Sequence, residues 1–436
     1  MQLKVWQDLS EAERLQALTR PAQDDGARVR GIVEEIIARI KQEGDEALHH
    51  YSKTLDHFEG ENIELTAAEI EAACAQVDKK LKAAIDQAYK NIKAFHKAQK
   101  PTHVKLETFP GITCRTAAHA IESVGLYVPG GSAPLVSTAL MLAVPAKIAG
   151  CQEIILCSPP PINPAIIYAA VRAGVRRIFN LGGAQAIAAM AYGTQSVPKV
   201  LKIFGPGNQF VTMAKRLVSD DAAGAAIDMP AGPSEVLVIA DKHANPRFVA
   251  ADLLSQAEHG PDSQVLLLSD SRELIEAALK AADEELETLP RKAIAEKSLA
   301  KSSAILCEDL QQCVEISNRY APEHLILQTQ NAKKLLPSLH NAGSIFVGAF
   351  TPESLGDYAS GTNHTLPTYG YAKTCSALGT DDYRRRYTIQ FASERGLKGI
   401  GHVVQDLAAA ESLQAHRNAV TVRLEEIEKR GRCKKK

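Results

Sequence analysis

Two side chains that could bind a metal ion lie near the end of an apolar helical stretch, FVAADLLSQAEHGPDSQ at positions 248–264. Asn245 is suited to cap this helix, and the Gly-Pro pair after His259 cannot continue it, so we expect the helix to end at His259. Gln256 precedes His259 by three residues, so its amide oxygen and the imidazole can converge on one point. The pair indicates a metal site, while a solvated last helical turn is the alternative that these residues leave open.

Further polar groups occur in the second half of the chain, at the expected ends of strands or in loops. They are PEH at 322–324, GDY at 356–358, and Glu411 and His416 in a helical segment over 401–428. Asp357 and His416 would add a carboxylate and a second imidazole to the amide and imidazole described above. Such a set suits Zn²⁺ and tolerates Mn²⁺ or Co²⁺. Spacing alone does not show that the four side chains meet.

The composition limits the classes of partner. The chain has 436 residues, enough for two or more domains, and its net charge of -1 argues against nucleic acid and anionic membranes as partners. The eight Cys include no C-x-x-C pair, so reduced thiols in a cytoplasm are the simplest account. The N-terminus lacks the apolar core of a signal peptide, and the most apolar stretch, 135–150, is too short to span a bilayer. We therefore expect a soluble, cytoplasmic protein.

The hydrophobic pattern indicates an α/β fold. The first hundred residues are typical of helices, with an apolar stripe from Val29 to Ile40 that includes Ile32, and a capping box at Thr66 and Glu69. Beyond Ala120, short apolar runs alternate with helical stretches, as in parallel sheets covered by helices. The expected strands are 124–128, 153–157, 177–179, 200–204 and 235–240, then a second series at 265–268, 304–307, 325–327 and 344–347. We predict two incomplete Rossmann-like parallel-sheet domains, a helical N-terminal scaffold and a small helical C-terminal segment.

Several expected strand-to-helix turns are rich in glycine, namely Pro129-Gly130-Gly131, Gly182-Gly183 and Gly205-Pro206-Gly207. In doubly wound sheets ligands bind beyond the carboxyl ends of the strands, and the free N–H groups of a helix start favour phosphate. These turns therefore suggest a dinucleotide site. GPGNQF, however, has only two of the three glycines of G-x-G-x-x-G, and tight turns need glycine for steric reasons in any case.

Six motifs in this order resemble the histidinol dehydrogenase family: GPGNQF, AGPSEVLV, SQAEHGPDS, APEHL, GDYASGTNHTLPT and ESLQAHRNAV. The resemblance extends from about residue 20 to residue 425 of the printed sequence. It implies an NAD-dependent, zinc-containing enzyme of histidine biosynthesis. Such an enzyme oxidises L-histidinol to L-histidine, through bound L-histidinal, in two successive hydride transfers.

The resemblance also implies roles for individual residues. The metal ligands would be Gln256, His259, Asp357 and His416, and the acid–base pair would be Glu323 and His324. The substrate would contact Ser234, His364 and Glu411, together with Gln256, His259, His324, Asp357 and His416. NAD would face Tyr127, Gln185 and Asn208. Asn208 is equally well placed to cap the helix that follows it, and the two roles are compatible.

The family resemblance further implies a homodimer whose subunits complete each other's active sites. The expected parts are an N-terminal segment 1–21, a larger α/β domain of 22–126 with 236–378, an NAD-facing domain 127–235 and a dimerisation segment 379–436. Glu411 and His416 would come from the partner. On an uninterrupted helix they would lie about 140° apart, so either the helix breaks near Leu413 or one of them does not touch the substrate.

Three other interpretations compete with this one. An aldehyde dehydrogenase would use a Cys nucleophile, but Cys157, Cys307 and Cys313 lie in strand or helix patterns. A non-catalytic, two-lobed metabolite-binding protein would leave the Glu323-His324 pair unexplained. A member of the same family acting on another amino alcohol or diol would share the fold and the cofactor, and it is the strongest alternative.

Overall fold

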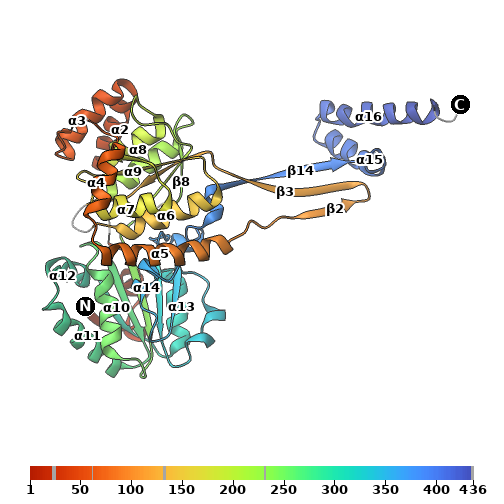
Figure 1. Cartoon of the computed structure of the whole chain (residues 1–436). Helices are drawn as coiled ribbons and strands as arrows, with labels where there is room; N and C mark the ends of the chain where they lie inside the picture. The colour runs from red at the N-terminus through yellow and green to blue at the C-terminus, as the bar shows by residue number, and fades with distance from the viewer. Residues whose placement is uncertain (22–25, 61, 131–133, 230–231, 434–436) are drawn as a thin grey trace. The chain divides into compact units, whose positions relative to one another are not determined.

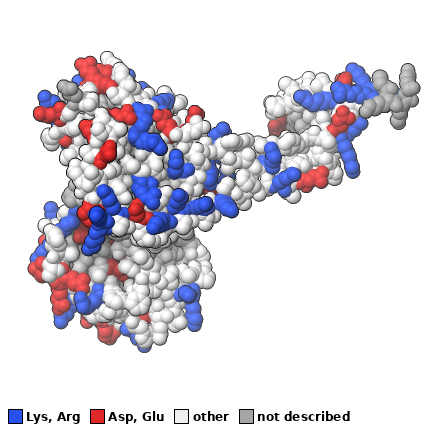
Figure 2. All heavy atoms as spheres, in the orientation of Figure 1, with Lys and Arg blue, Asp and Glu red and all other residues white. Residues whose placement is uncertain are grey.

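The computed structural model describes residues 1–21, 26–60, 62–130, 134–229 and 232–433. Gly131 of the first glycine-rich turn lies outside these residues. Contacts divide the chain into two units, Met1–Gln99 with Ile121–Tyr383, and Lys100–Ala120 with Arg384–Lys436. In the described residues no helix combines the length and the apolarity needed to cross a membrane. Figure 2 shows acidic and basic side chains interspersed over the visible face of the first unit.

The first unit contains a five-stranded parallel sheet in the order β6-β5-β4-β7-β8. Its strands are β4 (Ser123–Tyr127), β5 (Glu153–Ser158), β6 (Arg177–Asn180), β7 (Lys202–Phe204) and β8 (Ala226–Ile227). The helices between them are α6 (Val136–Ala149), α7 (Pro164–Ala173), α8 (Gly183–Tyr192) and α9 (Gln209–Asp220). Figure 1 shows α8 and α9 above this sheet and α6 and α7 below it.

The N-terminal helices pack on this same five-stranded sheet. They are α2 (Gly26–Glu43), α3 (Asp45–Leu55), α4 (Ala67–Gln76) and α5 (Lys79–Ala98); α2 contacts α8 and α9, α4 contacts α7, and α5 contacts α6 and α7. The predicted stripe is buried at Val29, Val33 and Ile40, although Ile32 is exposed. The apolar face of α2 is buried against α8 and α9, and β4 pairs with both β5 and β7. The division into 1–21, 22–126 with 236–378, 127–235 and 379–436 stays a prediction.

A six-stranded parallel sheet completes the first unit, in the order β1-β11-β10-β9-β12-β13. Its strands are β1 (Gln2–Val5), β9 (Glu235–Ala240), β10 (Gln264–Ser269), β11 (Ser303–Leu306), β12 (His324–Gln328) and β13 (Ser344–Val347). Its helices are α1 (Glu11–Leu18), α10 (Pro246–Ala257), α11 (Arg272–Leu286), α12 (Lys292–Ala300), α13 (Leu310–Tyr320) and α14 (Glu353–Tyr358). Short 3₁₀ helices are Trp6–Asp8, Ala332–Lys334, Leu336–Ser338, Tyr371–Lys373 and Thr380–Tyr383.

Strand β9 lies at the centre of the six-stranded sheet. Alternate residues of a strand face opposite sides, so Val236 and Val238 pack with α10 to α12 while Leu237 and Ile239 pack with α13 and α1. In sequence β9 follows the first series of strands, yet it pairs with β10 and β12. Strand β1 was not predicted, because four residues give no readable pattern and only pairing with β11 makes them a strand.

The second unit is an antiparallel sheet, β14-β3-β2, followed by two helices. Its elements are β2 (Lys105–Phe109), β3 (Ile112–Ala120), β14 (Arg384–Ala392), α15 (Glu394–Ala410) and α16 (Gln414–Cys433). The predicted helical C-terminal segment is present as α15 and α16. Strand β14 precedes it and was not predicted, although the alternation of Tyr387, Ile389 and Phe391 with polar residues is a strand signal. Of the two alternatives for Glu411 and His416, the structure shows the helix break, because α15 ends at Ala410 and Ser412 has a φ of 59°.

Gly205, in the turn after β7, and Gly348, after β13, allow a test of whether the turn after β7 requires glycine. Gly205 and Gly348 both have positive φ, but a Cβ at Gly205 would collide with the carbonyl oxygen of Tyr127, whereas the space at Gly348 is open. We expect Gly348→Ala to lower the free energy of unfolding by about 1–2 kcal/mol from backbone strain alone. Gly205→Ala should cost about 1–3 kcal/mol more from the collision. Urea unfolding of both variants measures the difference, and equal losses would contradict it.

Candidate active site

A cavity of about 120 Å³ lies in the first unit, between the carboxyl ends of one sheet and the amino ends of the other. The five-stranded sheet contributes the turn after β7, with Gly205 and Pro206, and the residues after β8. The six-stranded sheet contributes residues just before β9 and β12. Of the predicted site residues, the cavity is lined by Ser234, His259, Glu323, Asp357 and His364. The position at the amino ends of β9 and β12 departs from the usual carboxyl-end location in parallel sheets.

The backbone of one residue, Glu235, holds both members of the predicted acid–base pair. Its N–H donates to Oε2 of Glu323 at 2.8 Å, and its carbonyl oxygen lies 3.0 Å from Nδ1 of His324. Nδ1 therefore carries the proton in the neutral imidazole, and Nε2 is left as the basic nitrogen. Among the described residues Nε2 has no hydrogen-bond partner, and it lies 3.4 Å from Oδ1 of Asp357.

Burial and neighbouring charge both act on this pair, whose residues are only 6% and 4% exposed. Burial raises the pKa of Glu323, although His324 opposes this effect. Burial also lowers the pKa of His324, but the carboxyl groups of Glu323, Asp357 and Glu353 outweigh it, so the pKa is raised. The surroundings thus favour proton uptake by both side chains.

Three of the predicted metal ligands belong to this first unit. Helix α10 ends at Ala257, two residues before the predicted end, and His259 lies on the turn that follows. The neighbours of Gln256 fix its amide, with Nε2 2.9 Å from Oε1 of Glu353 and Oε1 3.2 Å from the N–H of Glu235. Among the described residues, no group of three or more His, Cys, Asp or Glu side chains is arranged to hold a metal ion.

The chemistry of His259 and Asp357 nevertheless suits a metal. Desolvation lowers the pKa of His259, partly offset by Asp357. Burial raises the pKa of Asp357, but the neighbouring imidazole of His324 outweighs it and lowers the pKa. A metal binds neutral imidazole and ionised carboxylate, which are the forms these shifts favour.

The remaining substrate positions are divided between the two units. Nε2 of His364 lies 3.3 Å from Oγ1 of Thr138 on α6, and burial lowers the pKa of this imidazole. Glu411 and His416 belong to the second unit, where Glu411 follows α15 and His416 lies in the first turn of α16. Both are exposed, and neither lines the cavity.

The three residues predicted to face NAD lie at the end of β4, in the first turn of α8 and at the N-cap of α9. The hydroxyl of Tyr127 accepts a hydrogen bond from the N–H of Gly183 at 3.0 Å. Nε2 of Gln185 donates to Asp56 at 3.0 Å, while its Oε1 is buried without a partner among the described residues. Asn208 caps α9 by accepting from two backbone N–H groups, which confirms its structural role. A buried, unpaired acceptor and an exposed helix start suit a polar ligand such as a dinucleotide.

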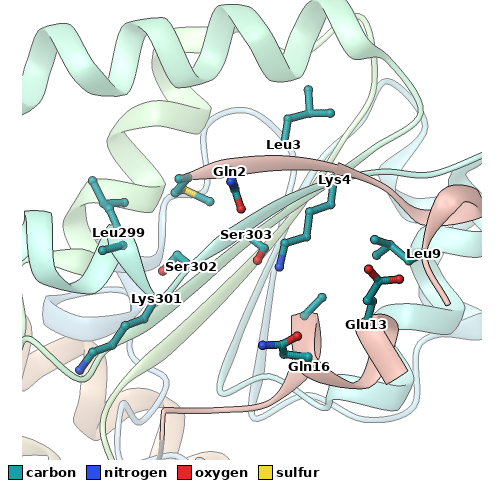
Figure 3. A pocket seen from close by; sticks show the side chains of 13 residues that line it. Gln2, Leu3, Lys4, Leu9, Glu13, Gln16, Leu299, Lys301, Ser302 and Ser303 are labelled. Carbon is teal, nitrogen blue, oxygen red and sulfur yellow. The ribbon is translucent and has the colours of Figure 1, made fainter. Parts of the chain in front are cut away.

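A wider cavity, of about 870 Å³, lies along β1, α1 and the residues before β11 (Figure 3). It contains none of the predicted site residues. Its carboxylate, Glu13, is already engaged in a capping box with Ser10. We therefore place the chemistry at the smaller cavity.

Sequence reasoning missed Glu235, Glu353, Asp56 and Arg20. Glu235 and Glu353 are each 1% exposed. For Glu235 the sequence contains a signal, because a charged residue stands at the start of an otherwise apolar strand, EVLVIA. The others gave no signal, because their partners lie far away in the sequence.

Two parallel-sheet lobes that enclose a cavity with a buried carboxyl–imidazole pair define a two-lobed α/β enzyme. A family model described as histidinol dehydrogenase matches residues 18–424. The chain belongs to the histidinol dehydrogenase family, and it is therefore an oxidoreductase. The family name gives the activity as oxidation of histidinol, a reaction of histidine biosynthesis.

Individual relatives agree with this assignment. The histidinol dehydrogenase of Vibrio vulnificus (strain CMCP6) is 55% identical over 431 residues, which covers 99% of this chain and 100% of the relative. That of Vibrio cholerae is 54% identical over 429 residues, covering 98% and 100% of the two chains. The crystal structure of histidinol dehydrogenase from Elizabethkingia anophelis has a TM-score of 0.95 at 46% identity, covering 98% of this chain and 99% of that one.

Asp252, on the helix that carries Gln256, allows a test of how burial in this region raises the pKa of a carboxyl group. It is 5% exposed, and burial raises its pKa to about 6 from 3.8 although Gln328 donates to it. Because the folded state binds this proton more tightly, the associated stability is present at low pH and is lost as the pH rises through about 4 to 6. We expect Asp252→Asn to match the unsubstituted protein near pH 4 and to exceed its stability by about 3 kcal/mol above pH 6. Urea unfolding across this range measures the gap, and parallel pH curves would contradict the expectation.

Proposed function

We propose that the enzyme oxidises L-histidinol to L-histidine by two successive hydride transfers to NAD, through bound L-histidinal, in the cytoplasm. The observation that carries the proposal is the buried pair Glu323 and His324, which the backbone of Glu235 holds together and of which Glu323 lines the cavity. One zinc ion per subunit is the proposed metal, with Mn²⁺ or Co²⁺ as substitutes. Oxidation of another amino alcohol or diol remains the alternative, which Ser234 and His364 at the same cavity make less favourable.

His324 is the proposed base for the alcohol. In the neutral imidazole Nε2 has the free lone pair, because Nδ1 donates to the carbonyl of Glu235. It would take the hydroxyl proton as the hydride leaves the neighbouring carbon for NAD. The nearby carboxylates of Glu323 and Asp357 would stabilise the imidazolium that forms.

Glu323 is the proposed base for the second oxidation. An aldehyde carries no hydroxyl from which a carboxylic acid could form directly, so water must add to it first. A buried carboxylate with a raised pKa is a stronger base than an ordinary one, which suits it to take a proton from that water. The hydrate then gives its hydride to a second NAD and becomes the carboxylic acid.

Gln256, His259 and Asp357, completed by His416 of the partner subunit, are the proposed zinc ligands. When bound, zinc would orient the substrate's nitrogen ligands and retain the aldehyde while NADH is exchanged for NAD. Gln256 and His259 lie at the carboxyl end of α10, where the helix dipole favours a cation. The proposed NAD contacts are Tyr127, Gln185 and Asn208, at the strand ends and helix starts of the other sheet.

A homodimer is proposed because the second unit has little core of its own. Its exposed large apolar side chains are Val104, Leu106, Phe391, Val403, Val404, Leu407, Leu413 and Val422, and α16 buries little besides Ile427. A small unit with so few buried residues gains stability by packing against another surface. The break at Ser412 also removes the obstacle of the uninterrupted helix, so Glu411 and His416 need not point in different directions.

The thiol mechanism of an aldehyde dehydrogenase gains no support from the structure. Cys157, Cys307 and Cys313 are buried, and none of them lines the cavity. Burial raises the pKa of Cys157, which disfavours the nucleophilic thiolate. Membership of an enzyme family also disfavours a binding protein without catalysis.

The first functional test is stoichiometric. If one site performs both oxidations, two NADH should form for each histidinol consumed, and semicarbazide should trap little free aldehyde. Absorbance at the NADH band and quantitative amino-acid analysis measure the two sides of the ratio. A yield of one NADH with trappable aldehyde would refute the single-site account.

The second test addresses the shared site. His416→Asn and His259→Asn proteins are unfolded together and refolded as a mixture, with each variant refolded alone as the control. If His416 acts in the partner's site, a mixed dimer has one site with both ligands and one with neither. Because about half of the dimers are mixed, about one quarter of the sites should be intact. No gain of activity over the controls would show that each subunit supplies its own ligands.

A further inference from the structure

We propose that Arg20 is a positioning residue for the reaction, acting through its ion pair with Glu235 on both members of the acid–base pair. The proposal rests on the proposed roles of Glu323 and His324. Arg20 lies in the N-terminal segment, two residues after α1, and does not line the cavity. Its influence would therefore pass through Glu235.

Arg20 forms a bidentate ion pair with Glu235 through two nitrogens of its guanidinium group. Nε lies 2.5 Å from Oε1 of Glu235, and Nη2 lies 2.9 Å from Oε2. The side chains are 14% and 2% exposed, so the pair is almost fully removed from water. Such a forked pair fixes the direction of the carboxylate as well as its distance, which the point charge of Lys cannot do.

The same guanidinium group also holds the chain just before the acid–base pair. Nη2 donates to the carbonyl oxygens of Tyr320 at 2.9 Å and Ala321 at 3.2 Å, and the group stacks on the Tyr320 ring at 3.9 Å. Ala321 has a left-handed φ of 56°, a conformation that needs support in a residue other than glycine. Arg20 thus ties the turn that leads into Glu323 to the first residue of β9.

Because Arg20 restrains the position of Glu235, it also restrains the two proposed acid–base side chains, which are bonded to the Glu235 backbone. The N–H of Tyr369 donates to its Oε1 at 2.7 Å, so its side chain is held from a second direction. Its own N–H and carbonyl are the groups that hold Glu323 and His324. The two groups flank the same Cα, so a displacement of the Glu235 backbone would shift both hydrogen bonds together. Arg20 should therefore affect the alcohol and the aldehyde step alike.

The test replaces Arg20 with Lys, which keeps the positive charge and loses the fork. We expect kcat to fall on the order of 10- to 100-fold, with histidinol and with histidinal supplied directly. The KM for histidinol should stay within about two-fold, because no contact with the substrate is lost. Glu323→Gln is the comparison, since it should slow chiefly the aldehyde step.

Arg177→Lys is the matched control. Arg177 makes a similar fork with Glu64, through Nε and Nη2 at 2.8 Å each, on the five-stranded sheet. It should lose stability with kcat unchanged. Arg20→Met with Glu235→Gln removes both charges, and this double variant should stay slow if the fork itself is what positions the pair. The kcat of the double variant also tests the proposal if Arg20→Lys does not fold.

Three outcomes would overturn the proposal: an unchanged kcat in folded Arg20→Lys, a loss confined to one of the two steps, or a full recovery in the double variant. Folded protein is quantified by thermal unfolding, so that a lower yield is not mistaken for a lower kcat. The NADH yield of the unsubstituted enzyme and the activity of Glu323→Gln test the proposed function itself. A failure of that function is thereby distinguished from a failure of the role proposed for Arg20.

Discussion

The position of Glu235 is the constraint on which the site depends. It is the first residue of the central strand, where it pairs with Gln264 of β10, and its buried carboxylate is fixed by Arg20 and Tyr369. A buried carboxylate left without partners would be strongly destabilising, so these contacts must form together with the sheet. The N–H and the carbonyl oxygen of Glu235 can then hold Glu323 and His324 in place. Sheet pairing and catalytic geometry therefore share one residue.

The opposite polarity of the two sheets explains how one cavity can suit different ligands. Helices that follow the carboxyl ends of the five-stranded sheet present their N-termini there, and these favour phosphate. Helices α10 and α13 precede β10 and β12, so their C-termini lie at the amino ends of the six-stranded sheet and favour cations. The proposed NAD residues lie on the first sheet and the proposed zinc ligands beside the second. The arrangement thus follows from strand direction, before any individual side chain is considered.

The second unit has a different physical basis. Its strands and helices satisfy their backbone hydrogen bonds, but its apolar side chains remain largely exposed. Such a unit is stable when it packs against a larger surface. The same requirement supports the proposed dimer, and Glu411 and His416 both belong to this second unit.

The sequence by itself determined, to within about two residues, the strands of both parallel sheets except β1 and β8, and it determined the cap at Asn208 and the family. It could do so because helix caps, turns and apolar alternation act between residues close in the chain. For Glu411 and His416 it offered two alternatives, one of which was a helix break near Leu413. It also named Ser234, His259, Glu323, Asp357 and His364, which the structure brings to one cavity, but it did so through family motifs. Only the tertiary structure decided that β1 is a strand, that α2 to α5 pack on the five-stranded sheet, that the site lies at the amino ends of β9 and β12, and that Arg20 supports it. Each of these depends on contacts between residues far apart in sequence: Arg20 meets Glu235 across 215 positions, and no local pattern encodes that meeting.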